Sequence, residues 1–195
     1  MPNALARTLS ILGHPLLLLP AAALLLAAHE GANAQRLSGL ALSLGIAAAI
    51  VLAWSWWQVR RRRWQHVDAS DHGERRALNQ FLLVMFVMAT LVLWAWTTQR
   101  ELALGMALSA LLIATAMLSS RWCKLSLHVA FALYASVLLA QVSWIACLGG
   151  MLFTGAVAWS RLALARHAPR DLVAGAFAGL LAGLLFWRLL PVVAG

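Results

Sequence analysis

Long apolar stretches follow one another along the chain, and they constrain its fold more than any other feature. A helix needs about 20 apolar residues to cross the hydrocarbon core of a bilayer, and only helices and closed barrels satisfy their backbone polar groups there. The spacing predicts an all-α fold, a polytopic membrane helix bundle of six to seven transmembrane helices. The expected helices cover residues 12–29, 38–58, 79–97, 102–119, 126–147, 151–165 and 169–190.

Composition agrees with a membrane protein. The chain is 63% hydrophobic, with a mean hydropathy of +0.83, and only 11% of it is charged, against the usual quarter of a soluble domain. Residues 1–195 suit a single integral membrane domain. The net charge of +9 indicates first a set of cytoplasmic loops and second an anionic ligand. Nucleic acid is excluded as a partner, because no soluble basic domain exists to bind it.

The first segment, residues 1–37, has two readings. Pro15 and Pro20 lie inside its apolar stretch, which predicts a kinked first membrane helix. The alternative is a signal peptide, because Ala32-Asn33-Ala34 before Gln35 resembles a cleavage site.

Three polar segments interrupt the apolar pattern, at residues 59–78, 119–126 and 160–171. An even number of predicted helices separates each from the next, so all three should emerge on the same membrane face. Ionisable groups beside the hydrocarbon core are costly, about 2.5–3.5 kcal/mol for an arginine at its centre, and therefore indicate function.

The segment Ser160–Asp171 carries the clearest chemistry, with three arginines and His167. His167 and Asp171 are four residues apart, which places them on one face of a helix. The aspartate could then accept the ring proton and make the other ring nitrogen more basic. Pro169 suits the first turn of a following helix, whose free amides would face an anion. The segment therefore predicts an anion pocket with a histidine nucleophile.

The other two polar segments could supply ligands to the same anion. Lys124, Ser126 and His128 alternate, so an extended chain could aim all three at a phosphate, with His128 protonating the leaving oxygen. A histidine at a helix start can equally be an interfacial residue. Arg75 and Arg76 either form a solvated charge run or grip phosphate bidentately.

These residues resemble the signatures of the type 2 phosphatidic acid phosphatase superfamily. Ser160-Arg161, five residues, His167, three residues, Asp171 is similar to its third signature, and Ala174-Gly175 also fits. Its second signature is a Pro-Ser-Gly-His run, and here Leu125-Ser126-Leu127-His128 keeps Ser and His. The resemblance covers a phosphatase-like core at about residues 59–190.

The first signature, a lysine followed six residues later by Arg-Pro, is poorly kept. Arg75 or Arg76 could supply the arginine, but neither precedes a proline and the lysine is absent. Asp68, Asp71 and Glu74 occupy that region instead.

The resemblance implies an integral membrane phosphatase that hydrolyses a lipid phosphate or isoprenyl pyrophosphate through a phosphohistidine intermediate, with no metal or other cofactor. His167 would be the nucleophile, Asp171 its orienting partner and His128 the general acid. The implied phosphate ligands are Arg161, Arg75 and Ser126, with Lys124 and Ser160 as weaker additions. A phosphotransferase on the same fold and a catalytically degenerate binder of lipid head groups are the alternatives. The expected location is the inner, or cytoplasmic, membrane of a bacterium.

Two further patterns concern packing. Gly175, Gly179 and Gly183 recur every four residues, which lets helices approach closely in lipid, either inside the bundle or at the seam of a homodimer. Cys123 and Cys147 should lie on opposite membrane faces, about 30 Å apart, too far for a disulfide bond.

Overall fold

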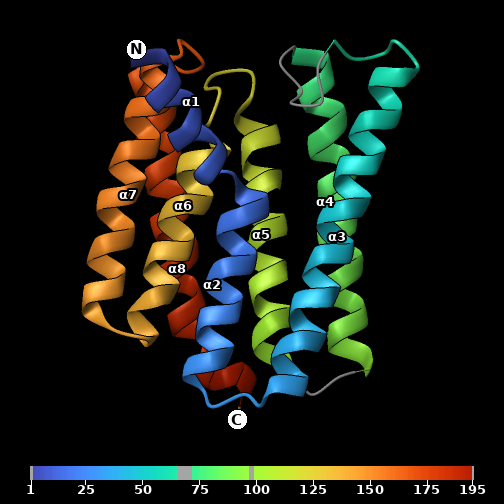
Figure 1. The fold of residues 1–195 in the computed structure, drawn as a ribbon, viewed down its shortest axis with the longest axis vertical. Coiled ribbons are helices and arrows are strands. Elements are labelled where there is room, and N and C mark those ends of the chain that lie inside the picture. The colour runs from blue at the N-terminus through green and yellow to red at the C-terminus, as the bar shows by residue number, and fades with distance from the viewer. Residues whose placement is uncertain (1, 66–71, 97–98, 195) are drawn as a thin grey trace.

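A computed structural model describes residues 2–65, 72–96 and 99–194, and all regular secondary structure in those ranges is helical (Figure 1). This confirms the all-α prediction. The elements are α1 (Pro2–Leu12), α2 (Pro15–His29), α3 (Ala34–Arg60), α4 (His72–Trp96), α5 (Arg100–Ser119), α6 (Leu127–Leu138), a 3-10 turn η1 (Leu139–Gln141), α7 (Trp144–Ala163) and α8 (Pro169–Ala194).

Five of the described helices, α3, α4, α5, α7 and α8, are long and apolar enough to cross a membrane. The helices α1 and α2 meet at 48° and make a sixth candidate if they form one broken span, whereas α6 with its 3-10 extension is shorter. These lengths are compatible with an integral membrane protein.

The break predicted between the helices at residues 126–147 and 151–165 is in the wrong place, because Gly149 and Gly150 both lie inside α7. The chain turns earlier, between α6 and α7, where Ser143 Oγ accepts a hydrogen bond from Ala146 N at 3.0 Å and caps the start of α7. Gly150 lies inside α7, and a Cβ there would lie 2.6 Å from Ser136 Oγ. That glycine therefore permits close contact between two helices instead of ending one.

The predicted helix end before Pro191 is also wrong, because α8 continues to Ala194 with Pro191 inside it. A proline removes one backbone hydrogen bond, and only the final turn of α8 follows it. The helix α3 begins at Ala34, earlier than the predicted start at residue 38. Asn33 caps this start, because its Oδ1 accepts a hydrogen bond from Arg36 N at 2.8 Å.

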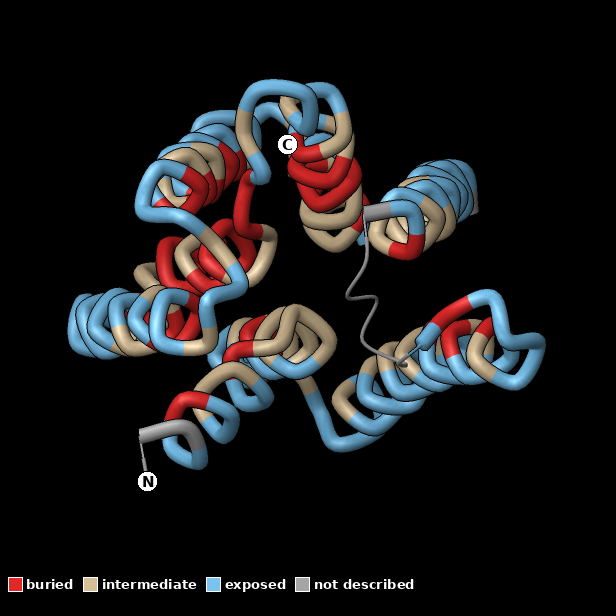
Figure 2. Tube along the Cα trace, turned by 90° about the horizontal axis from the view of Figure 1, so that it is seen from above, coloured by how far each residue is buried: buried red, intermediate tan, exposed pale blue. Residues whose placement is uncertain are grey.

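The buried core surrounds α6, in which nine of twelve residues are buried. Tyr134 and Phe131 of α6 pack with Ile113 of α5 and Phe186 of α8. The helices α3 and α4 contribute far less to this core, and only three α3 residues are buried; Figure 2 shows the same contrast between the two sides of the bundle.

The glycine stripe of α8 faces α6. A Cβ at Gly175 would lie 2.5 Å from Ser126 O, one at Gly179 would overlap Ala130 O, and one at Gly183 would lie 2.5 Å from Val137. The stripe therefore packs within the bundle, as the first of the two readings predicts, and holds the start of α8 against the start of α6.

The convergence of the polar segments is confirmed. The end of α3, the α5–α6 connection and the α7–α8 turn lie at the same end of the bundle as the N-terminus, and the C-terminus lies at the other (Figure 1). Cys123 lies at the first end and Cys147 in the first turn of α7 at the opposite end, and both are free. The end of the bundle that holds the three polar segments is called the polar end below.

Candidate functional site

The turn between α7 and α8 presents His167. It reverses at Ala165, whose φ of 50° lies in the left-handed region, which glycine usually occupies at a helix C-terminus and which costs an alanine about 1–2 kcal/mol. Arg166 N donates to Arg161 O at 3.0 Å and closes the turn. The strain is offset by contacts that fix the following residues.

Asp171 supplies several of those contacts. Its Oδ2 accepts a hydrogen bond from Ala168 N at 3.1 Å, as an acidic residue does in a capping box, and its Oδ1 accepts from Lys124 N at 3.1 Å. The helix start predicted at Pro169 is confirmed. Asp171 therefore joins the start of α8 to the segment that leads into α6.

His167 donates to a backbone carbonyl. Its Nδ1 lies 3.0 Å from Lys124 O and 3.7 Å from Asp171 Oδ2. A carbonyl oxygen can only accept, so Nδ1 carries the proton and Nε2 keeps its lone pair. The sequence predicts Asp171 as the acceptor of the ring proton, but the nearer acceptor is the carbonyl oxygen of Lys124. Asp171 acts on the ring by holding the segment that carries this carbonyl.

The surroundings keep His167 neutral. Burial lowers the pKa of His167 to about 4, assisted by the positive charges of Arg161 and Arg75 and opposed by Asp171. The side chain is 8% exposed. A neutral ring with a free lone pair is the form that can act as a nucleophile.

Two arginines and a second histidine share a cavity with His167. Arg161 is 8% exposed, and its Nη1 donates to Ser10 Oγ at 2.7 Å. Arg161, Arg75, His128 and His167 all line the cavity. The structure thus brings together four of the residues that the sequence singles out.

Two residues of this cluster were not anticipated, Ser10 and His14. His14 caps α2, accepting from Leu16 N at its Nδ1 at 3.2 Å, and its ring meets that of His128 edge to face at 5.0 Å. An ionisable residue inside an apolar segment indicates function, and this signal could have identified His14. Ser10 has no such signal.

The remaining predicted ligands are placed differently. Lys124 lines the cavity, but its Nζ donates to Arg166 O at 3.0 Å. Ser126 and Ser160 are fully buried and absent from the described cavity wall. Ser160 Oγ donates to Val157 O at 2.6 Å, and Ser126 Oγ has no hydrogen-bond partner among the described residues.

The structure describes only part of the polar segment 59–78, in which the first signature is poorly kept. Glu74 is buried, and its Oε1 accepts from Gln65 N at 2.7 Å, which ties the start of α4 to the chain after α3. Asp68 and Asp71 lie outside the described residues.

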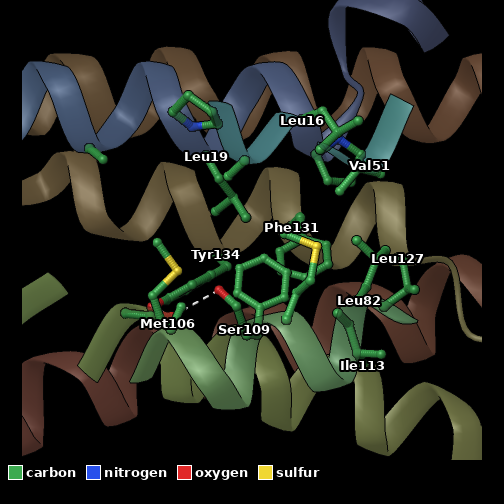
Figure 3. Close-up of a pocket in the computed structure, with 18 of the residues that line it drawn as sticks. Leu16, Leu19, Val51, Leu82, Met106, Ser109, Ile113, Leu127, Phe131 and Tyr134 are labelled. Carbon is green, nitrogen blue, oxygen red and sulfur yellow. Dashed lines mark hydrogen bonds between the residues drawn. The ribbon is translucent and has the colours of Figure 1, made fainter. Parts of the chain in front are cut away.

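The cavity has a volume of about 2230 Å³ and extends between α2, α3, α4, α5 and α6. Figure 3 shows its apolar middle, where Leu19, Val51, Met106 and Phe131 point inward. The cationic cluster lies at the polar end, and Glu30, Arg36, Arg100 and Glu101 line the opposite end.

This arrangement can hold an anion beside a neutral histidine ring whose Nε2 is unprotonated. Within the described ranges, no group of three His, Cys, Asp or Glu side chains is placed to bind a metal ion. Comparison of the chain with protein-family models, curated proteins and solved structures finds no match.

Proposed function

We propose that this protein is an integral membrane phosphatase that hydrolyses a lipid phosphate or pyrophosphate through a phosphohistidine intermediate. The observation that carries the proposal is the placement of His167. Its Nδ1 donates to Lys124 O, which leaves Nε2 unprotonated beside Arg161 and Arg75, at the polar end of a largely apolar cavity.

The chemistry proceeds in two steps. Nε2 of His167 attacks phosphorus while the bond to the leaving oxygen breaks, and His128 donates a proton to that oxygen. A water molecule then attacks the phosphorus atom of the phosphohistidine and gives a proton back to His128, while the bond between phosphorus and Nε2 breaks and inorganic phosphate leaves. Arg161 and Arg75 stabilise the charge on the non-bridging oxygens during both steps.

The cavity suits a substrate that has a phosphate head group and a hydrocarbon chain. The head group occupies the cationic end of the cavity and the hydrocarbon chain its apolar middle. In this proposal the bent pair α1–α2 forms one span and α6 with η1 another, so that seven segments cross the inner membrane of a bacterium. The short α6 is accommodated by snorkelling of polar side chains and local bilayer thinning.

Purified protein in detergent, given a phosphatidate or a polyprenyl pyrophosphate labelled in the phosphate, tests the proposal. Phosphate should be released without added metal, and rapid quenching in alkali should trap label on His167. His167→Ala should abolish both signals. His29→Ala, an exposed histidine at the opposite end of α2, is the matched control and should retain activity.

A head-group binder without activity is the competing outcome, and the missing lysine of the first signature favours it. Such a protein would bind the labelled lipid and release no phosphate. Turnover by His167→Ala equal to that of the unaltered protein would rule out the phosphohistidine mechanism.

A further inference from the structure

Four consecutive arginines, Arg60–Arg63, stand at the end of α3, and the proposed chemistry uses none of them. All four side chains are exposed, and none belongs to the wall of the cavity that His167 lines. Within the described ranges, none of the four forms an ion pair with a carboxylate. Adjacent like charges repel one another, so this part of the polar end should attract an anion.

The backbone holds the four arginines in a defined turn. Arg63 N donates to Gln58 O at 3.0 Å and Arg62 N donates to Val59 O at 2.8 Å, which are the two hydrogen bonds of a Schellman motif. This motif usually has glycine in the left-handed region, and here Arg62 occupies it with a φ of 55°. An arginine at a position that favours glycine indicates that its side chain has a role.

Two tryptophans hold the first two arginines at the level of the membrane surface. The guanidinium carbon of Arg60 lies 4.8 Å from the centre of the Trp56 ring, and that of Arg61 lies 4.1 Å from the centre of the Trp57 ring. Both indoles are exposed, and α3 is long and apolar enough to cross a membrane. Tryptophans at the end of such a helix lie among lipid head groups, so the guanidinium groups lie at the depth of the lipid phosphates.

We infer that Arg60–Arg63 form a binding surface for the head group of an anionic phospholipid, separate from the cavity. Guanidinium groups bind phosphate bidentately, and arginine clusters of this size beside a membrane helix attract anionic lipids. A membrane lipid fits better than a soluble anion, because the cation–π contacts hold the arginines against rings at the bilayer surface. The surface does not depend on the proposed phosphatase activity.

Lipid binding at this surface also stabilises the position of α3. Only Val51, Ser55 and Gln58 of this helix are buried, so the rest of the bundle holds it weakly, although it forms one wall of the cavity. A ligand that binds only the folded state raises the stability of that state. An anionic lipid should therefore raise the melting temperature of the protein, and a neutral one should not.

Native mass spectrometry of the protein in neutral detergent, titrated with phosphatidylglycerol or phosphatidylcholine, tests the inference. The unaltered protein should bind phosphatidylglycerol more tightly. Arg60→Gln combined with Arg61→Gln should weaken that binding roughly 25-fold, since each arginine near the surface contributes about fivefold, and should leave phosphatidylcholine binding unchanged. Arg100→Gln is the matched control, because Arg100 lies 4.7 Å from the centre of the Trp94 ring at the opposite end of the bundle. It should change neither affinity.

Arg161→Gln separates this surface from the proposed phosphate site, because Arg161 lines the cavity. It should leave phosphatidylglycerol binding unchanged even where it lowers phosphatase activity. Loss of phosphatidylglycerol binding in Arg161→Gln, with normal binding in the double variant, would place the lipid in the cavity and overturn the inference.

Arg62→Gly provides a second variant with effects of opposite sign. Glycine relieves the left-handed strain, so the melting temperature in neutral detergent should rise by roughly 2–4 °C, whereas the further rise produced by phosphatidylglycerol should become smaller. An equal lipid-induced rise in the unaltered protein and in both variants would overturn the inference. Displacement of the lipid by millimolar inorganic phosphate would also overturn it, because the surface would then bind any small anion.

Discussion

Lys124 O and Asp171 act on His167 in different ways. The carbonyl of Lys124 accepts the proton of His167 Nδ1, while the carboxylate of Asp171 accepts backbone N–H groups of Lys124 and Ala168. The ring is therefore oriented by a peptide segment, and Asp171 determines where that segment lies. A substitution of Asp171 should therefore change the orientation of the His167 ring indirectly, by moving the backbone of Lys124.

The protonation state of His167 leads to a testable prediction. Burial and Arg161 lower the pKa of His167 to about 4, so the neutral, nucleophilic ring should persist from neutral pH downward and be lost only as the pH falls through about 4. Histidine-labelled NMR spectra in detergent should show that midpoint. Arg161→Gln should raise it, because one of the charges that disfavours the protonated ring is removed.

A midpoint near 6.5, the ordinary value for histidine, in the unaltered protein would contradict the buried, arginine-flanked placement of His167.

Ser10 and His14 give a second prediction. Ser10→Ala removes the acceptor of Arg161 Nη1 and should raise KM for the lipid phosphate several-fold with a smaller change in kcat, whereas Ser10→Thr retains a hydroxyl and should preserve KM. His14→Asn keeps an N-cap oxygen for Leu16 N but removes the ring that packs on His128. It should lower kcat with little change in melting temperature.

If His14→Asn lowered the melting temperature as much as His14→Ala and left kcat intact, His14 would be a structural cap only. Equal KM values for Ser10→Ala and Ser10→Thr would show that the Ser10 hydroxyl does not contribute to phosphate binding.

Contacts between helices set the alignment of these residues, and α8 approaches α6 closely along its glycines. Gly179 lies against the backbone of Ala130, and a backbone cannot move aside as a flexible side chain does. Gly179→Leu should therefore lower stability by about 1–3 kcal/mol, the usual cost of overpacking, or more. A reduced melting temperature in detergent is the expected measurement.

Gly155→Leu is the control for this prediction, since Gly155 lies in α7 and a Cβ there meets nothing within 4 Å. It should leave the melting temperature unchanged or raise it slightly, because glycine is a poor helix former. Identical melting temperatures for Gly179→Leu and the unaltered protein would contradict the close α6–α8 packing.

Charge is distributed unevenly over the molecule as a whole. Twelve of its 15 basic residues belong to segments at the polar end, and positive residues in short loops remain in the cytoplasm. Removing the proposed ligands Arg75, Lys124 and Arg161 still leaves nine against three. The three at the opposite end are Arg36, Arg100 and Arg188. A cytoplasmic site is therefore expected.

Ser120→Cys tests this orientation in a background without Cys123 and Cys147, because Ser120 is exposed at the polar end. A membrane-impermeant thiol reagent should leave it unlabelled in intact cells and label it after lysis. Ready labelling in intact cells would place the site outside the cytoplasm.

The features that depend on local pattern can be predicted from the order of the amino acids alone. Apolar runs place the helices, because a backbone in lipid must bond within its own segment. Parity then brings three polar segments to one end, and the spacing of Arg161, His167 and Asp171 around a helix start places them together. The separation of Cys123 from Cys147 follows from the same parity.

The contacts between side chains of different helices depend instead on how the helices pack in three dimensions. Hydropathy does not specify the rotation of each helix about its own axis or the distance between two helices. Both are set by side-chain packing, such as that of the α8 glycines against α6. That packing buries Ser126 and Ser160 away from the cavity, brings Ser10 to Arg161 and His14 to His128, and opens a cavity between α2, α3, α4, α5 and α6. None of these contacts is local in sequence, so no spacing rule could have predicted them.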